Sequence, residues 1–357
     1  MAALGPAPDR GFWRGKRVLL TGHTGFKGSW AAIWLAALGA EVTGLALPPD
    51  QAPSLFDLAG VASLIDSRFV DLRDEAAVAD VVAERSFDLV LHMAAQPIVR
   101  TAIEQPVETF TSNVMGTIHL LQALRAQLAL QAALVVTSDK VYANAETGRA
   151  FTETDALGGK DPYSASKAAT EIAVQSFASS YFEPVSMPLA TARGGNVIGG
   201  GDFSRDRIVA DIVRAARRQE PVVLRHPEAT RPWQHVLDCV AGYLVYLQAL
   251  AIDPSTPRSM NFGPRTGGRE VTVGELATLG AEALGAPAWR HEPDPRSIEA
   301  RSLAIDASLA RRALGFESRL DAAEAVALTM QWYRRQANGE DALGLCRAEI
   351  ADYESGA

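Results

Sequence analysis

The chain has 357 residues, of which 48% are hydrophobic and 21% are charged, so it is long enough for one large or two fused globular domains with a substantial core. Its 34 basic and 42 acidic residues give a formal net charge of −8, which argues against a surface that binds nucleic acid or anionic membranes. The two cysteines, Cys239 and Cys346, fit no metal-binding or redox spacing.

The first 16 residues are rich in Ala, Pro and Gly. They lack the apolar core of a signal peptide, so we expect a cytoplasmic protein. The longest apolar run, residues 30–47, is interrupted by Glu41 and by two glycines. This run therefore predicts a buried helix and strand rather than a membrane span, and no membrane partner is expected.

A strand, a glycine-rich turn and a helix follow in that order. Apolar residues predict a strand over 17–21, and the turn Gly22-x-x-Gly25-x-x-Gly28 leads into a helix that should end at Gly39. Glycines permit a tight turn and let a pyrophosphate approach the amide groups at a helix N-terminus, so the segment predicts a dinucleotide site. The residues predicted to bind the cofactor here are Gly22, Thr24, Gly25, Phe26, Lys27 and Gly28.

The second predicted strand, residues 41–45, bears on the choice of cofactor. A carboxylate that binds the ribose is expected at the end of this strand, but Asp50 comes several residues after it. No arginine stands nearby to bind a 2′-phosphate. NAD is therefore favoured over NADP by default. Further along, Asp71 and Leu72 could meet the adenine, although Asp71 could equally cap a helix.

Two more apolar strands are predicted over residues 88–92 and 133–137. Their alternation with helical stretches predicts a parallel sheet with helices on both faces. Gln96 and Arg100 lie in the segment after the first of these strands. This position makes both of them candidates for lining the substrate site.

Tyr163 and Lys167 are four residues apart, which places them on one face of a helix. There the ammonium could lower the tyrosine pKa from its reference value of about 10, so that the phenol could take a proton from a sugar hydroxyl. The helix should run to about residue 181. Together with a second apolar helical stretch over residues 104–127 it could pair across a two-fold axis, so we expect a homodimer or homotetramer.

The regular alternation of strands and helices ends near residue 194. A strand predicted over residues 184–192 leads into the glycine-dense stretch 194–201. Loops of this kind at the carboxyl ends of strands are where open α/β sheets bind ligands. Short strands over residues 222–224 and 260–262 then suggest a separate, smaller unit.

The expected fold class is therefore α/β. We expect a Rossmann-like doubly wound parallel sheet over residues 1–193, which binds NAD and takes back a segment around residues 232–262. Residues 194–357 should mainly form a smaller C-terminal substrate-binding α/β domain.

Polar side chains of the second half are candidates for binding a diphosphate, because planar guanidinium groups hold phosphate in a bidentate fashion. Arg231, inside Arg-Pro-Trp-Gln-His, is favoured among them, whereas His235 could contact a ribose or be structural. No His/Cys cluster has metal-ligand spacing, so no metal is expected. The candidate substrate-binding residues of this half are Asn196, Arg207, Arg231, His235 and Arg301.

Taken in order, these motifs resemble the extended short-chain dehydrogenase/reductase family over nearly the full chain. Within that family, Ser138-Asp139-Lys140 is similar to the nucleotide-sugar 4,6-dehydratases that act on CDP-glucose, whereas those acting on dTDP-glucose carry Thr-Asp-Glu. One departure is Gly194, which stands where the family pattern has alanine. The matching segments are Thr21-Gly22-x-x-Gly25-x-x-Gly28, His92-Met93-Ala94-Ala95, Asn113, Ser138 and Tyr163-x-x-x-Lys167.

The resemblance implies conversion of CDP-glucose to its 4-keto-6-deoxy form with loss of water, by internal hydride transfer through bound NAD. Tyr163 would take the C4 hydroxyl proton while NAD takes the C4 hydride. Lys167 would hold Tyr163 as the phenolate and contact the nicotinamide ribose, and Ser138 would hydrogen-bond the same substrate oxygen. Ala94, at a strand end, would lie against the cofactor.

The same resemblance gives roles to the two residues after Ser138. Asp139 would donate a proton to the departing C6 hydroxyl, and Lys140 would assist deprotonation at C5. A lysine at its reference pKa is charged at neutral pH, so Lys140 could act as a base only if burial lowered that pKa. Equally, Lys140 could stay charged and position Asp139 or stabilise the enolate.

Three alternatives remain open on sequence grounds. One is a 4,6-dehydratase for dTDP- or GDP-linked sugars, since CDP rests on resemblance alone. Another is an epimerase or decarboxylase on the same scaffold, which would not need Asp139 and Lys140. The third is a non-catalytic NAD-binding sensor, which the complete catalytic set disfavours.

Overall fold

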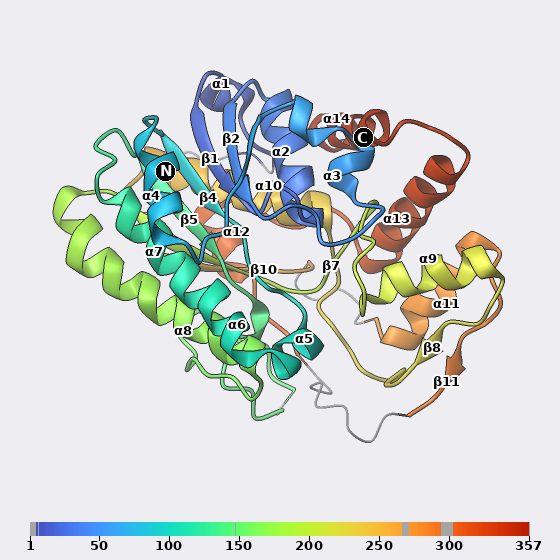
Figure 1. Cartoon of the computed structure of the whole chain (residues 1–357). Helices are drawn as coiled ribbons and strands as arrows, with labels where there is room; N and C mark the ends of the chain where they lie inside the picture. The colour runs from blue at the N-terminus through green and yellow to red at the C-terminus, as the bar shows by residue number, and fades with distance from the viewer. Residues whose placement is uncertain (1–4, 6, 147, 266–270, 294–302, 357) are drawn as a thin grey trace.

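A seven-stranded, fully parallel sheet forms the centre of the molecule in the computed structural model, which describes residue 5 and residues 7–146, 148–265, 271–293 and 303–356 (Figure 1). The strand order is β3-β2-β1-β4-β5-β6-β10, so the chain reverses its direction of winding between β1 and β4. The doubly wound α/β fold predicted from the sequence is thereby confirmed. The strands are β1 (Arg17–Thr21), β2 (Glu41–Ala46), β3 (Asp66–Phe69), β4 (Leu89–His92), β5 (Ala132–Val136), β6 (Leu189–Gly194) and β10 (Ser259–Phe262).

Helices cover both faces of the sheet (Figure 1). Side chains alternate along a strand, so Val18 and Leu20 join the core on one face while Leu19 joins the core on the other. The first face carries α2 (Phe26–Ala37), α10 (Val236–Ile252) and α14 (Ala342–Ser355), and the second carries α4 (Glu75–Ala83), α7 (Gly116–Leu124) and α8 (Pro162–Phe177). Within the described parts of the chain, no helix is long and apolar enough to span a membrane.

The chain after β6 divides between the sheet and a second group of elements. Helix α10 and strand β10 return to the sheet, with β10 paired to β6. The second group lies beside the carboxyl ends of the strands, and α9, α11, β8 and β11 form its outer part (Figure 1). Its elements are β7 (Val197–Ile198), α9 (Ile208–Arg218), β8 (Val223–Leu224), β9 (Gln234–His235), α11 (Val273–Leu284), β11 (Arg290–His291) and α13 (Ala322–Ala337).

Short elements complete the described chain. Helix α12 (Ser308–Leu314) packs against β10, and the 3-10 turn η3 (Asp139–Val141) follows β5 directly. The remaining elements are α1 (Arg10–Trp13), α3 (Leu55–Leu58), η1 (Val61–Ser63), α5 (Val99–Glu104), α6 (Pro106–Phe110), the π-helices η2 (Thr111–Met115) and η4 (Ala178–Phe182), and η5 (Glu183–Val185).

One predicted boundary was wrong. The strand expected over residues 184–192 begins only at Leu189. Pro184 lies in the 3-10 turn η5, and Ser186 adopts a left-handed conformation with φ of 57°, which is incompatible with an extended strand. By contrast, helix α2 ends beside Gly39, whose φ of 85° confirms the expected glycine stop.

The buried carboxyl group of Glu349 in α14 should make the free energy of unfolding depend on pH. Burial raises its pKa to about 8, and Oε2 has no hydrogen-bond partner among the described residues. The unfolded chain would ionise near pH 4.5, so the stability penalty should be absent below that pH, grow as pH rises to about 8, and stay constant above.

We therefore expect Glu349→Gln to raise the free energy of unfolding by about 1–3 kcal/mol at pH 8 and by much less at pH 5. Urea unfolding at both pH values measures this difference. Glu282→Gln, on an exposed part of α11, is the control and should change little at either pH. An equal effect of Glu349→Gln at the two pH values would contradict the expectation.

Candidate active site

The glycine turn packs against the next strand at the point where the sheet changes its direction of winding. A Cβ atom on Gly22 would lie 2.7 Å from the amide nitrogen of Ala94, and one on Gly28 would lie 1.9 Å from the carbonyl oxygen of Gly22. Gly25 is the N-cap of α2 and offers no side chain to the first amide groups of that helix. The turn therefore forms a cradle that a Cβ would fill, beside a helix N-terminus suited to a pyrophosphate.

The other predicted cofactor residues of this segment lie on the same turn. Thr24 donates a hydrogen bond from Oγ1 to the carbonyl oxygen of Leu47 after β2, at 2.9 Å. Phe26 and Lys27 are half-buried in the first turn of α2. The Lys27 ammonium lies 5.8 Å from the centre of the Tyr243 ring, so it points toward the face of the sheet that α10 covers.

A buried histidine links the ends of β1 and β4 behind this turn. Thr117 donates to the carbonyl of Asn113 (2.7 Å), so His92 must donate from Nε2 to Thr117 (2.9 Å) and accept at Nδ1 from Thr21 (2.6 Å). Burial, followed by the charge of Lys167, lowers the pKa of His92 to about 3. His92 therefore stays neutral and structural across the physiological pH range.

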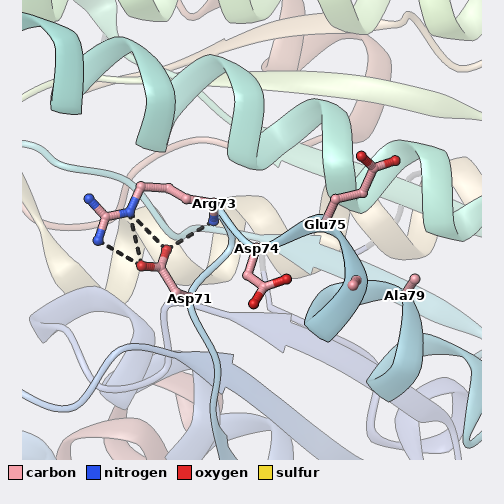
Figure 2. A pocket seen from close by; sticks show the side chains of 6 residues that line it. Asp71, Arg73, Asp74, Glu75 and Ala79 are labelled. Atoms are coloured by element: carbon pink, nitrogen blue, oxygen red, sulfur yellow. Dashed lines mark hydrogen bonds and ion pairs between the residues drawn. The ribbon is translucent and has the colours of Figure 1, made fainter.

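Asp71 and Leu72 lie in the segment between β3 and α4. The N-cap of α4 is Asp74, which accepts from the amide of Ala77, so the helix-cap alternative for Asp71 was wrong. Asp71 instead accepts from the Arg73 guanidinium at 2.6–3.0 Å beside an open surface hollow (Figure 2), and this hydrogen bonding lowers the pKa of Asp71. Leu72 is buried, and an adenine contact of this segment stays a prediction.

The five predicted catalytic residues come from two elements that meet at the carboxyl end of the sheet. Ser138, Asp139 and Lys140 follow β5, and η3 turns the chain there. Asp161 caps α8 by accepting from the amide of Ser164, so that helix starts just before Tyr163. All but Lys140, which is half-buried, are buried.

Hydrogen bonds of ordinary length hold the side chains of this cluster in place. The hydroxyl of Ser138 donates to Oδ1 of Asp139 at 3.0 Å, while Oδ2 of Asp139 has no partner among the described residues. The Lys167 ammonium donates to the carbonyl oxygen of Val136, the last residue of β5, at 3.1 Å. The cluster thus offers a phenol, a hydroxyl and a carboxylate side by side, backed by a buried cation.

The electrostatics of the tyrosine–lysine pair differ from the sequence expectation. Burial raises the pKa of Tyr163, and a hydrogen bond with Ser138 and the charge of Arg207 only partly offset this rise. Burial, followed by the charge of Lys27, lowers the pKa of Lys167 to about 7, against the effect of Glu171. Spacing alone predicted a lowered tyrosine pKa, because it took no account of how deeply both groups are buried.

Sequence reasoning missed a buried network below this cluster. The carboxylate of Glu171 accepts from Thr137 (2.5 Å), Thr191 (2.9 Å) and Arg193 (2.8 Å), and both members of its ion pair with Arg193 are almost fully buried. Arg193 also donates to the hydroxyl of Tyr142 (3.0 Å). Glu171 stands four residues after Lys167, so helical spacing could have drawn attention to it, but nothing local marks Arg193.

Asn113 was noted in the sequence only as a family match. It lies in the π-helix η2, where its amide donates to the hydroxyl of Ser166 (2.9 Å) and to the carbonyl of Gln96 (3.1 Å). It also accepts from the amide of Gln96 at 2.8 Å. Asn113 therefore ties the loop after β4 to the helix that carries Tyr163.

The predicted substrate residues lie in varied settings. The side chain of Gln96 forms hydrogen bonds with Ile98 in the same loop and with Thr109 of α6. Arg100 pairs with Asp206 at 3.4 Å, which joins α5 to the segment before α9. Arg207 lies near enough to Tyr163 for its charge to act there.

The other four candidates differ in their surroundings. His235 is fully buried and caps α10 by accepting from the amide of Leu237, which favours a structural role. Asn196 and Arg231 are half-buried, and Arg231 donates to the carbonyl of Thr230. Arg301 lies outside the described residues. In the described ranges, no group of three His, Cys, Asp or Glu side chains could hold a metal ion.

Fold and site together define a dinucleotide-binding enzyme in which a tyrosine and a lysine of one helix lie beside a serine at a strand end. The chain belongs to the NAD dependent epimerase/dehydratase family, whose sequence pattern matches residues 18–263. The family resemblance is thereby confirmed, and NAD is the cofactor of this enzyme family.

Individual relatives extend over almost the whole chain. A CDP-glucose 4,6-dehydratase of Salmonella typhimurium is 40% identical over 356 residues, which cover 97% of this chain and 98% of that protein. A dTDP-glucose 4,6-dehydratase of Xanthomonas campestris pv. campestris is 30% identical over 88% of this chain and 92% of that protein. A UDP-glucose 4-epimerase of Thermus thermophilus, solved as a complex with NAD, has a TM-score of 0.75 and 26% identity, covering 89% of this chain and 99% of that one.

Proposed function

We propose that the protein is a 4,6-dehydratase that converts CDP-glucose to CDP-4-keto-6-deoxyglucose and water. The observation that carries this proposal is the pairing of Tyr163 with Ser138 and Asp139, which supplies separate groups for oxidation at C4 and for loss of water. The 40% identity to the Salmonella enzyme over nearly the full length supports the choice of CDP-glucose.

The residues divide the proton transfers between them. Tyr163 takes the proton of the C4 hydroxyl, with the Ser138 hydroxyl bonded to the same oxygen and the Lys167 ammonium stabilising the phenolate. The glycine turn around Gly22 and Gly28 would hold NAD, which would supply a hydride acceptor for C4 and a hydride donor for C6, so that no cofactor would be consumed. The C4 carbonyl acidifies the C5 proton, and removal of that proton lets the C6 hydroxyl leave as water with a proton from Asp139. A solvent proton adds to C5 when hydride adds to C6.

Lys140 has two alternative parts in the elimination step, and two variants separate them. If the side chain removes the C5 proton, Lys140→Met should lower kcat by about 10²–10⁴-fold, and Lys140→Glu should restore part of it because a carboxylate can also accept a proton. If a positioning charge is all that is needed, Lys140→Glu should be the worse of the two. Steady-state rates decide, and unchanged turnover in Lys140→Met would remove Lys140 from the mechanism.

The proposed function is tested by incubating the purified protein with CDP-glucose or dTDP-glucose in heavy water, with and without added NAD. We expect CDP-glucose, but not dTDP-glucose, to lose one water molecule and to gain one solvent deuterium at C5. Mass spectrometry and NMR measure both changes. Dehydration of dTDP-glucose alone would overturn the choice of base. No water loss from either, with NADH binding intact, would favour an epimerase, a decarboxylase or a sensor.

We also propose that the enzyme is a cytoplasmic homodimer. Exposed apolar side chains gather on neighbouring elements of the α8 face, and a monomer would leave all of them in contact with water. Such a face can pair with its own copy across a two-fold axis. These residues are Ile103, Val107, Phe110, Met115 and Ile172, which are 38–79% exposed.

Val107→Asp should therefore dissociate the dimer, because a charge would be buried at the centre of this face. Light scattering should give about twice the chain mass of 38.1 kDa for the unaltered protein and the single chain mass for the variant. Leu128→Asp, at a 99% exposed position outside the face, should leave the mass unchanged. A monomeric mass for the unaltered protein would contradict the dimer.

A further inference from the structure

The hydroxyl of Tyr243 has no assigned role and an unusual setting. Tyr243 lies in α10, on the opposite side of the sheet from Tyr163, and is fully buried. Its oxygen has no hydrogen-bonding oxygen or nitrogen partner among the described residues, and the Cys239 thiol beside it is a weak hydrogen-bond partner. Burying a hydroxyl without a strong partner destabilises the folded state, so the fold retains this group at the expense of stability.

Gly194 makes room for this hydroxyl at the carboxyl end of β6. A Cβ atom at Gly194 would lie 2.2 Å from the Tyr243 oxygen, but 3.4 Å from the ring carbon that carries it, which is an ordinary contact. Only the hydroxyl, and not the ring, therefore requires glycine at this position.

The surroundings of the hydroxyl point toward the cofactor. The Lys27 ammonium of the glycine turn lies 5.8 Å from the ring centre. Burial, followed by the Cys239 thiol, raises the pKa of the phenol well above its ordinary value, and Tyr163 and Asp139 lie near enough to add to this effect. The phenol therefore stays protonated and can donate. Lys27 belongs to the helix start that suits a pyrophosphate, whereas Tyr163 and Asp139 belong to the cluster that suits the nicotinamide ribose.

We propose that the Tyr243 hydroxyl is a cofactor-binding group, which donates a hydrogen bond at the nicotinamide end of NAD, and that Gly194 admits it to the site. This inference rests on the proposed function, because it takes Tyr163 and Lys167 to mark the nicotinamide end. The bound NAD would accept the hydrogen bond for which the Tyr243 hydroxyl has no oxygen or nitrogen acceptor among the described residues.

The test uses Tyr243→Phe, which removes only the oxygen, and two measurements that should move in opposite directions. NADH affinity, from fluorescence titration without any sugar nucleotide, should fall about 5- to 20-fold. The unfolding temperature without added cofactor should rise by about 1–3 °C, because an unpartnered buried hydroxyl has been removed. Unchanged NADH affinity would overturn the proposal.

Tyr246→Phe is the matched control from the same helix. Tyr246 is also fully buried, but its hydroxyl donates to the carbonyl of Pro257 at 2.5 Å. Removing it should lower the unfolding temperature and leave NADH affinity unchanged. If both phenylalanine variants weakened NADH binding equally, the effect would come from α10 as a whole and the proposal would fail.

Gly194→Ala tests the geometry by a double-mutant cycle. Alone, it should weaken NADH binding as much as Tyr243→Phe does, because the methyl group displaces the hydroxyl. In the Tyr243→Phe background it should add little, since the ring carbon leaves room for a methyl group. If the losses of NADH affinity in the two single variants added up in the double variant, Gly194 would not act through the Tyr243 hydroxyl. An unaltered protein that binds no NADH would instead refute the proposed function itself.

Discussion

Tyr163→Phe is expected to lower kcat for CDP-glucose dehydration by about 10²–10⁴-fold. In the proposed mechanism the phenol takes the C4 proton while the Ser138 hydroxyl bonds to the same oxygen. Because the ring remains, the packing around α8 should persist. Steady-state rates, NADH titration and circular dichroism together measure the loss and confirm that binding and fold survive.

Ser138→Ala is the control for this variant, since it removes a hydrogen bond to the reacting oxygen but leaves the phenol in place. We expect a smaller loss than for Tyr163→Phe, of about 10- to 100-fold. Burial raises the pKa of Tyr163, so the rate of the unaltered enzyme should fall as pH decreases and the phenol stays protonated. Turnover near that of the unaltered enzyme in Tyr163→Phe would remove the tyrosine from the chemistry.

Glu171→Leu is expected to have the largest effect on stability, a loss of about 3–5 kcal/mol in the free energy of unfolding. The variant leaves the Arg193 guanidinium, 1% exposed, without its counter-charge. Burial alone would lower the pKa of Arg193, and the hydrogen bond and charge of Glu171 reverse that effect. Two threonine hydroxyls at β5 and β6 would also lose their acceptor.

Urea unfolding of two further variants makes this expectation specific. The double variant Glu171→Leu/Arg193→Met removes both charges and should recover a substantial part of the loss, because a buried pair can often be replaced by apolar residues. Glu340→Gln breaks the exposed pair with Arg335 and should change stability little. A loss for Glu171→Leu no larger than for Glu340→Gln would show that the buried pair is not needed.

The same carboxylate connects stability with the site. Glu171 binds Thr137, which directly precedes Ser138, and it opposes the lowering of the Lys167 pKa. Its loss should therefore let Lys167 shed its proton at a lower pH. In Glu171→Gln, the alkaline limb of the pH–rate profile should shift to lower pH. This shift would report the lowered pKa of Lys167 separately from any loss of folded protein.

The amino-acid sequence by itself determined the features that depend on neighbours along the chain. The strand, glycine turn and helix around Gly22 could be predicted because glycine, apolar runs and helix stops act within a few residues. The spacing of Tyr163 and Lys167 placed both on one helix for the same reason. The alternation of strands and helices was sufficient to predict a doubly wound sheet.

Only the tertiary structure decided which distant groups meet and how deeply they are buried. The contact of Gly194 with Tyr243 and the pairing of Glu171 with Arg193 join residues from different elements, whose mutual positions no local pattern specifies. The pKa of Tyr163 is raised rather than lowered because desolvation depends on everything packed around the phenol. Sequence spacing describes the partners available on one helix, whereas burial is a property of the assembled fold.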